Sequence, residues 1–162
     1  PYCATTFGVG EIIKDAFNHG CRKFLIGAGG SCTNDGGVGM LQALGYHFLD
    51  QNAKEVCFGA KGLKDITSID DTCVDPGIKE CSFFILSDVK NPLCGKQGAS
   101  YIFGPQKGAD QAMIEEMFIL TDIIDGVVWF FPRYLGLIFM TCTPWVLRVV
   151  LGMRCIRFCM VK

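Results

Sequence analysis

Residues 24–37 read FLIGAGGSCTNDGG, and this stretch decides the fold that we expect for the chain. Its apolar start, residues 24–26, predicts a short buried strand, and the glycines that follow predict a turn. Residues 37–44 then repeat apolar side chains at helical spacing and stop at Gly45, which predicts a helix. A strand, a glycine-rich loop and a helix in this order are typical of an α/β fold whose ligands bind beyond the strand ends.

Two more glycine-rich segments follow later in the chain. Residues 88–95 read DVKNPLCG, directly after an apolar run at 82–86 that predicts a strand, and residues 103–109 read FGPQKGA. Such loops have little bulk and offer backbone N–H groups, which suits a close approach to phosphate. Three of them in one chain predict phosphoryl chemistry.

Three charged residues in these loops are candidates for that chemistry. The carboxylates of Asp35 and Asp88 could orient a hydroxyl or hold a hydrated Mg²⁺, and Lys107 could contact phosphate. Each also has a simpler interpretation. Asp35 could cap the helix that starts beside it, Asp88 could form a turn, and Lys107 could be an ordinary surface lysine.

The other elements are expected from the same patterns. Residues 10–19 predict a helix that stops at Gly20, residues 46–49 a strand, and residues 110–117 a helix, while 98–103 could be a short helix or strand. The pattern of residues 54–80 is mixed and predicts no single element.

Composition divides the chain near residue 118. Residues 1–117 hold ten Lys/Arg and fourteen Asp/Glu, whereas residues 118–162 hold five Lys/Arg, two Asp and both tryptophans. We expect an α/β domain at 1–117 and an apolar tail, helical or disordered, at 118–162. The tail could be an unselected sequence such as a frameshift product, a membrane or interface helix through 134–153, or a divergent core segment.

Charge and cysteines limit the remaining possibilities. The net charge of −1 gives no basic field for nucleic acid, and the ten cysteines and two histidines lack zinc-site spacing. His19 and His47 are isolated in the sequence and are interpreted as structural or exposed. We expect a cytoplasmic protein with reduced, mostly buried thiols.

Four segments together resemble the bacterial-type glycerate kinase family, a two-domain α/β family without a Walker loop. They are TFGVGEII at 6–13, GAGGSCTNDGG at 27–37 followed by MLQALG at 40–45, DVKNPLCG at 88–95, and GA at 98–99 with FGPQKGA at 103–109. The resemblance covers about residues 2–117. Cys32 and Cys94 stand where the family has alanine and often threonine.

The resemblance implies phosphorylation of D-glycerate by ATP with Mg²⁺, giving 2-phosphoglycerate. It adds Asn34 and Asn91 to the candidate cleft. It also implies Asp35 or Asp88 near the glycerate hydroxyl or the metal. Lys107 and the backbone of Gly29, Gly30 and Ser31 would then lie on phosphate or carboxylate.

Family chains are longer at both ends, so we expect this chain to be a piece of an enzyme that is inactive by itself. The alternative is a membrane-anchored or inactive anion-binding module without turnover.

Overall fold

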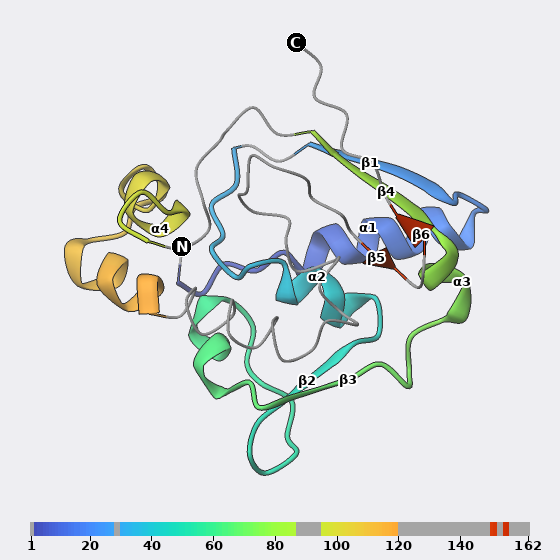
Figure 1. Ribbon diagram of the computed structural model, residues 1–162, viewed down its shortest axis with the longest axis horizontal. Helices are drawn as coiled ribbons and strands as arrows, with labels where there is room; N and C mark the ends of the chain where they lie inside the picture. The colour runs from blue at the N-terminus through green and yellow to red at the C-terminus, as the bar shows by residue number, and fades with distance from the viewer. Residues whose placement is uncertain (1, 28–29, 87–94, 120–149, 152–153, 156–162) are drawn as a thin grey trace.

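The computed structural model describes residues 2–27, 30–86, 95–119, 150–151 and 154–155 (Figure 1). In chain order the helices and strands are α1 (Phe7–Asn18), β1 (Lys23–Gly27), α2 (Val38–Ala43), β2 (His47–Leu49), the 3₁₀ helix η1 (Ala60–Asp65), β3 (Ser68–Asp70), α3 (Pro76–Glu80), β4 (Ser82–Leu86), α4 (Ala99–Phe103), the 3₁₀ helix η2 (Pro105–Lys107), β5 (Val150–Leu151) and β6 (Arg154–Cys155). Residues 111–119 form one more helix.

These elements confirm the predicted α/β class. The strands expected at 24–26, 46–49 and 82–86 are β1, β2 and β4, and the helices expected at 37–44 and 110–117 are present. Residues 98–103, for which helix and strand were both open, contain α4. The unassigned stretch 54–80 contains η1, β3 and α3; Asp75 caps α3 by accepting from Gly77 N at 2.7 Å, and Pro76 begins the helix.

Helix α1 begins earlier than the sequence pattern predicted, at Phe7 instead of Gly10. Thr6 is its N-cap residue, but the Thr6 side chain makes no capping bond to its own helix. The Thr6 hydroxyl donates instead to Asp35 Oδ2 at 2.9 Å. The start of α1 is therefore fixed by a residue 29 positions away, which a local pattern does not reveal.

Strands β1 and β4 form a parallel pair in which Gly27 is opposite Leu86. Because parallel strands end at the same edge of a sheet, the segments that follow β1 and β4 both leave from that edge. Phe24 and Phe83 are neighbours across the pair, and their rings stack with centroids 5.0 Å apart. The predicted loop 27–37 thus starts at the edge where β4 also ends, and residues 88–94 of the second predicted loop lie outside the described residues.

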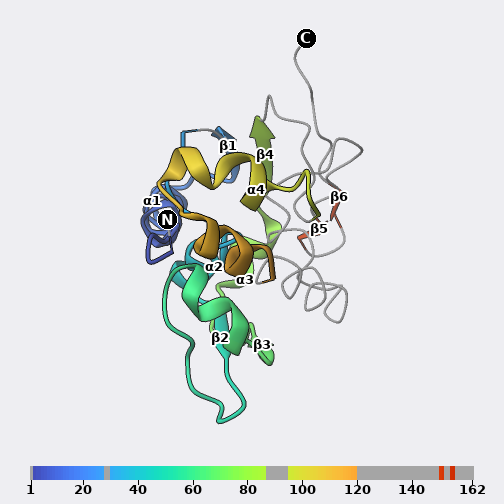
Figure 2. The ribbon, with the colours of Figure 1, turned by 90° about the vertical axis from the view of Figure 1, so that its left-hand side faces the viewer.

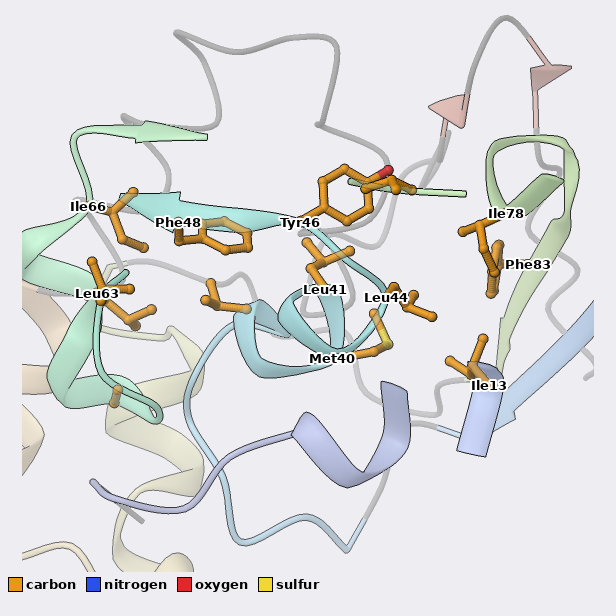
Figure 3. Packing of buried hydrophobic residues seen from close by; sticks show 14 of the residues in the cluster. Ile13, Met40, Leu41, Leu44, Tyr46, Phe48, Leu63, Ile66, Ile78 and Phe83 are labelled. Atoms are coloured by element: carbon orange, nitrogen blue, oxygen red, sulfur yellow. The ribbon is translucent and has the colours of Figure 1, made fainter. Parts of the chain in front are cut away.

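Helix α2 lies between the β1–β4 pair and the antiparallel β2–β3 pair (Figures 1 and 2). Met40 and Leu41 of α2 and Leu44, which directly follows α2, are at most 3% exposed and lie at the centre of the buried cluster (Figure 3). Phe48 of β2 and Phe83 of β4 belong to the same cluster. The β1–β4 pair and the β2–β3 pair therefore pack against the same short helix and share one core.

The apolar segment 118–162 is described only at residues 118–119, which are helical, and at β5 and β6. These two strands pair antiparallel, with Val150 opposite Cys155, where a helix or disorder was expected. The rest of the predicted tail, including 134–149 of the possible membrane segment, lies outside the described residues, and the division at residue 118 stays a prediction. Within the described part, no helix is long and apolar enough to cross a membrane.

The expectation that the thiols are mostly buried is wrong for the described cysteines. Of the six free thiols in the described residues, only Cys81 is buried, and Cys3, Cys21, Cys32, Cys57 and Cys73 are exposed. All five exposed cysteines lie outside helices and strands. Connecting segments run over the surface, so their side chains face water even when they are weakly polar.

Two glycines of α1 give a matched test of the α1–α2 packing. A Cβ on Gly10 would lie 2.3 Å from Met40 O and 2.6 Å from Ala43 Cβ, whereas a Cβ on Gly8 would meet nothing within 4 Å. Gly10→Ala is expected to lower the free energy of unfolding by roughly 1–3 kcal/mol through overpacking. Gly8→Ala should leave it unchanged or raise it by up to about 1 kcal/mol through helix propensity. Urea denaturation of both variants measures this, and equal effects would contradict the packing.

Candidate functional site at the end of strand β1

The loop after β1 turns its first described residues toward solvent. Gly30, Ser31 and Cys32 are exposed, and Gly30 has a left-handed backbone with φ 63°. A side chain added at Gly30 would meet nothing within 4 Å. The backbone of 30–32 is therefore accessible to a ligand, as the predicted anion-binding role of Gly30 and Ser31 requires.

Asp35 has the opposite environment. It is 1% exposed, and its carboxylate accepts five hydrogen bonds. Oδ2 accepts from Thr6 N at 2.7 Å, from Thr6 Oγ1 at 2.9 Å and, more weakly at 3.3 Å, from Thr5 Oγ1. Gly37 N donates to Oδ1 at 3.2 Å and Gly39 N to Oδ2 at 3.3 Å. A buried carboxylate is stable only when paired in such a way.

The Asp35 carboxylate holds the N-terminal ends of two helices together. Thr6 precedes α1, and Gly37 and Gly39 begin α2. Thr6 Oγ1 donates to Asp35 and accepts from Met40 N at 2.9 Å, so it bridges the two helix starts. The space is filled, since a Cβ on Gly39 would lie 2.0 Å from Thr5 Oγ1. Asp35 thus caps the start of α2, as one of the two interpretations expected. It also binds the residue before α1, which the sequence did not indicate.

A second group of bonds joins the loop to the segment around α4. Lys107 Nζ donates to Thr33 O at 2.6 Å, and Asn34 Nδ2 donates to Ser100 Oγ at 3.2 Å. Ser100 is 1% exposed. The loop is therefore attached on one side to α1 and α2 through Asp35, and on the other side to residues 98–108.

The structure brings together five of the eight predicted site residues: Gly30, Ser31, Asn34, Asp35 and Lys107. Gly29, Asp88 and Asn91 lie outside the described residues, so the predicted approach of Asp35 and Asp88 within about 10–12 Å through a hydrated Mg²⁺ stays a prediction. Sequence reasoning missed Ser100. Its only signal was a small polar residue in the GAS triplet at 98–100, beside one of the glycine-rich segments.

The predicted Mg²⁺ at Asp35 or Asp88 stays a prediction. The lone pairs of Asp35 are directed at protein donors, and no group of three or more His, Cys, Asp or Glu side chains in the described ranges could hold a metal ion. The phosphate-binding prediction has two supporting features in the described residues. Residues 30–32 are exposed, and Lys107 contacts Thr33 in the same loop.

Comparison with known proteins agrees with this arrangement. A sequence model of the glycerate kinase family matches residues 1–120. The chain belongs to the glycerate kinase family. The resemblance inferred from the four glycine-rich segments is therefore confirmed.

Individual relatives show how much of the family the chain covers. It is 49% identical over 117 residues to glycerate kinase of Haemophilus influenzae and to glycerate 2-kinase of Escherichia coli, covering 72% of this chain and 31% of each relative. The crystal structure of a protein proposed to be glycerate kinase 2 from Salmonella typhimurium LT2 has a TM-score of 0.79 and 36% identity, over 94% of this chain and 40% of that one. The chain thus spans about a third of the length of these curated relatives.

The bond from Lys107 to Thr33 gives a testable consequence for loop mobility. Lys107→Met keeps the length of the side chain but removes the charged donor, and hydrogen bonds of charged groups contribute about 1.5–3 kcal/mol. Amide hydrogens of residues 33–37 are expected to exchange roughly tenfold faster in this variant, measured by hydrogen–deuterium exchange. Lys96→Met, at an exposed lysine, is the control and should leave these amides unchanged. Equal exchange in both variants would contradict a fastening role for Lys107.

Proposed function

We propose that residues 2–119 form part of a glycerate kinase that transfers a phosphoryl group from ATP to D-glycerate and yields 2-phosphoglycerate. The shared edge at which β1 and β4 end, and a bond between two of the glycine-rich segments, support this proposal. The loop after β1 and the segment after β4 start at one sheet edge, and Lys107 joins the third segment to the first. Kinase catalysis is mostly positioning and charge stabilisation, and this edge supplies both backbone donors and a cation.

Within this proposal, the exposed backbone of Gly30 and Ser31 binds phosphate or the glycerate carboxylate. Lys107 adds positive charge to this loop, because its ammonium group donates to Thr33 O, two residues beyond Ser31. Asn34 is fixed by Ser100 and can present its carbonyl oxygen to a hydroxyl.

The two candidate carboxylates receive different roles. Asp35 already accepts five hydrogen bonds from protein donors, so we assign it to holding the loop and the helix starts in place. Asp88, two residues beyond the end of β4, is the carboxylate that we propose near the glycerate hydroxyl, with Mg²⁺ as the cofactor and Asn91 beside it. When bound, Mg²⁺ would supply neutralisation of phosphate charge.

The sharpest test places this segment in a complete relative. Residues 2–117 are exchanged for the matching part of Haemophilus influenzae glycerate kinase, to which they are 49% identical. The chimera is expected to phosphorylate D-glycerate with ATP and Mg²⁺, with ³¹P NMR distinguishing 2- from 3-phosphoglycerate. Asp88→Asn should lower kcat by about 10²–10³, the cost of losing a group that stabilises the transition state. Lys107→Ala should mainly raise KM, by roughly tenfold.

The exposed Asp65 provides the control, because Asp65→Asn should change kcat/KM less than about twofold. If Asp88→Asn and Lys107→Ala keep kcat/KM within about threefold of the parent chimera, worth only ~0.65 kcal/mol, these residues form turns and take no part in the reaction. A chimera that binds glycerate or ATP but shows no turnover would favour the alternative of an inactive anion-binding module.

A further inference from the structure

Strand β1 has one open edge. Its backbone pairs on one side with β4, and within the described residues it pairs with no other strand. Ser82 N of β4 donates to Arg22 O at 2.8 Å, so every second residue from Arg22 onward directs its backbone groups at β4. The N–H and C=O groups of Lys23, Leu25 and Gly27 therefore point to the opposite edge.

The side chains of β1 do little to protect this edge. Native proteins commonly protect an edge strand with inward-pointing charges, proline or a bulge. The central residue of β1 is instead Leu25, which is 67% exposed, and the only charged residue is Lys23 at the start of the strand. The apolar run 24–26 has the pattern of a strand that is covered on both faces, as strands of parallel sheets are. The edge is therefore suited to pairing with another strand.

The sequence of β1, KFLIG, is complementary to itself when two copies run antiparallel. With Leu25 opposite Leu25 of the second copy, Lys23 lies opposite Gly27. The residues whose backbone groups point outward are then opposite one another, and such residues exchange both hydrogen bonds in an antiparallel pair. The single charged side chain of the strand meets a glycine, so this register brings no like charges together. The exposed leucines meet at the two-fold axis.

We propose that the chain forms a two-fold dimer by antiparallel pairing of β1 with β1 of a second copy, which joins the two β1–β4 pairs into one four-stranded sheet. Both copies use the same edge, so the assembly closes at two chains. Because the strand has only five residues, the interface is small, and we expect a weak dimer with a Kd on the order of 10–100 µM.

The register also has a consequence for the candidate site. It places the partner's Lys23 opposite Gly27, the last residue of β1 before the candidate-site loop. The dimer is nevertheless independent of the proposed reaction, because it is detected by molecular mass and amide exchange and not by turnover.

Sedimentation equilibrium of the 162-residue chain, between about 2 and 200 µM, tests the dimer. The mass is expected to rise from one chain to two and no further. Leu25→Lys places like charges opposite each other at the axis and should raise the Kd roughly tenfold. Ile12→Lys is the matched control, because Ile12 is 72% exposed on α1 and lies outside the interface.

Three results would overturn the dimer. They are a mass that stays at one chain, a mass that rises beyond two, and an Ile12→Lys variant that dissociates as readily as Leu25→Lys. The first would leave the edge to strands of a longer glycerate kinase, since the chain spans 31% of its relatives. The last would indicate non-specific association of apolar surface.

A charge-swapped mixture tests the register. Leu25→Lys and Leu25→Glu are each expected to be mainly monomeric, whereas an equimolar mixture should form a heterodimer, because opposite charges then face each other at the axis. A mixture that stays monomeric would overturn the pairing of Leu25 with Leu25.

Amide exchange of the unsubstituted chain gives a readout that does not depend on the folding of any variant. The outward N–H groups of Lys23 and Leu25 should become more protected as the protein concentration rises. Those of Phe24 and Ile26, which face β4, should not change. Protection of Lys23 and Leu25 that is the same at every concentration would overturn the proposal.

Discussion

The buried carboxylate of Asp35 is the constraint on which the rest of the structure depends. Removing it from water without partners would cost several kcal/mol, so the fold must bring donors to it. Those donors come from the residue before α1 and from the first residues of α2. The same contacts fix the end of the loop that follows β1. A single side chain thereby sets the distance between two helices and the position of the candidate site.

This arrangement explains why small residues surround Asp35. Gly39 leaves room for the Thr5 hydroxyl, and Gly10 lets α1 lie directly on the backbone of α2. Helix α2 and the residue after it in turn present Met40, Leu41 and Leu44 to the core that the β1–β4 and β2–β3 pairs share (Figure 3). The glycine-rich sequences around the loop therefore serve two purposes, close packing on one side and accessible backbone at 30–32 on the other.

Much of the fold could be predicted from the sequence because its signals are local. The apolar run at 82–86 marks β4 to the residue, and Gly20 and Gly45 mark helix ends with left-handed backbones at φ 93° and 100°. The partners of Asp35 could not be predicted in the same way, since Thr6 lies 29 positions away. Ser100 and Asn34 are 66 positions apart, and His47 is bonded to Glu55, eight positions along the chain. Long-range polar contacts leave no periodicity in a sequence, so the sequence left the ligand role and the capping role of Asp35 both open and gave no sign of its bonds to Thr6.

The most direct test of this account is a double-mutant cycle between Asp35 and Thr6, measured as free energies of unfolding in urea for the parent chain, Asp35→Asn, Thr6→Val and the double variant. Asp35→Asn keeps the shape but turns an acceptor into a donor among donors, and Thr6→Val removes the hydroxyl that bridges the helix starts. The account predicts that both single changes destabilise the chain and that they couple by at least about 1 kcal/mol, as contacting polar residues do. Additive effects within about 0.5 kcal/mol would contradict it, because Asp35 would then not hold the two helices together.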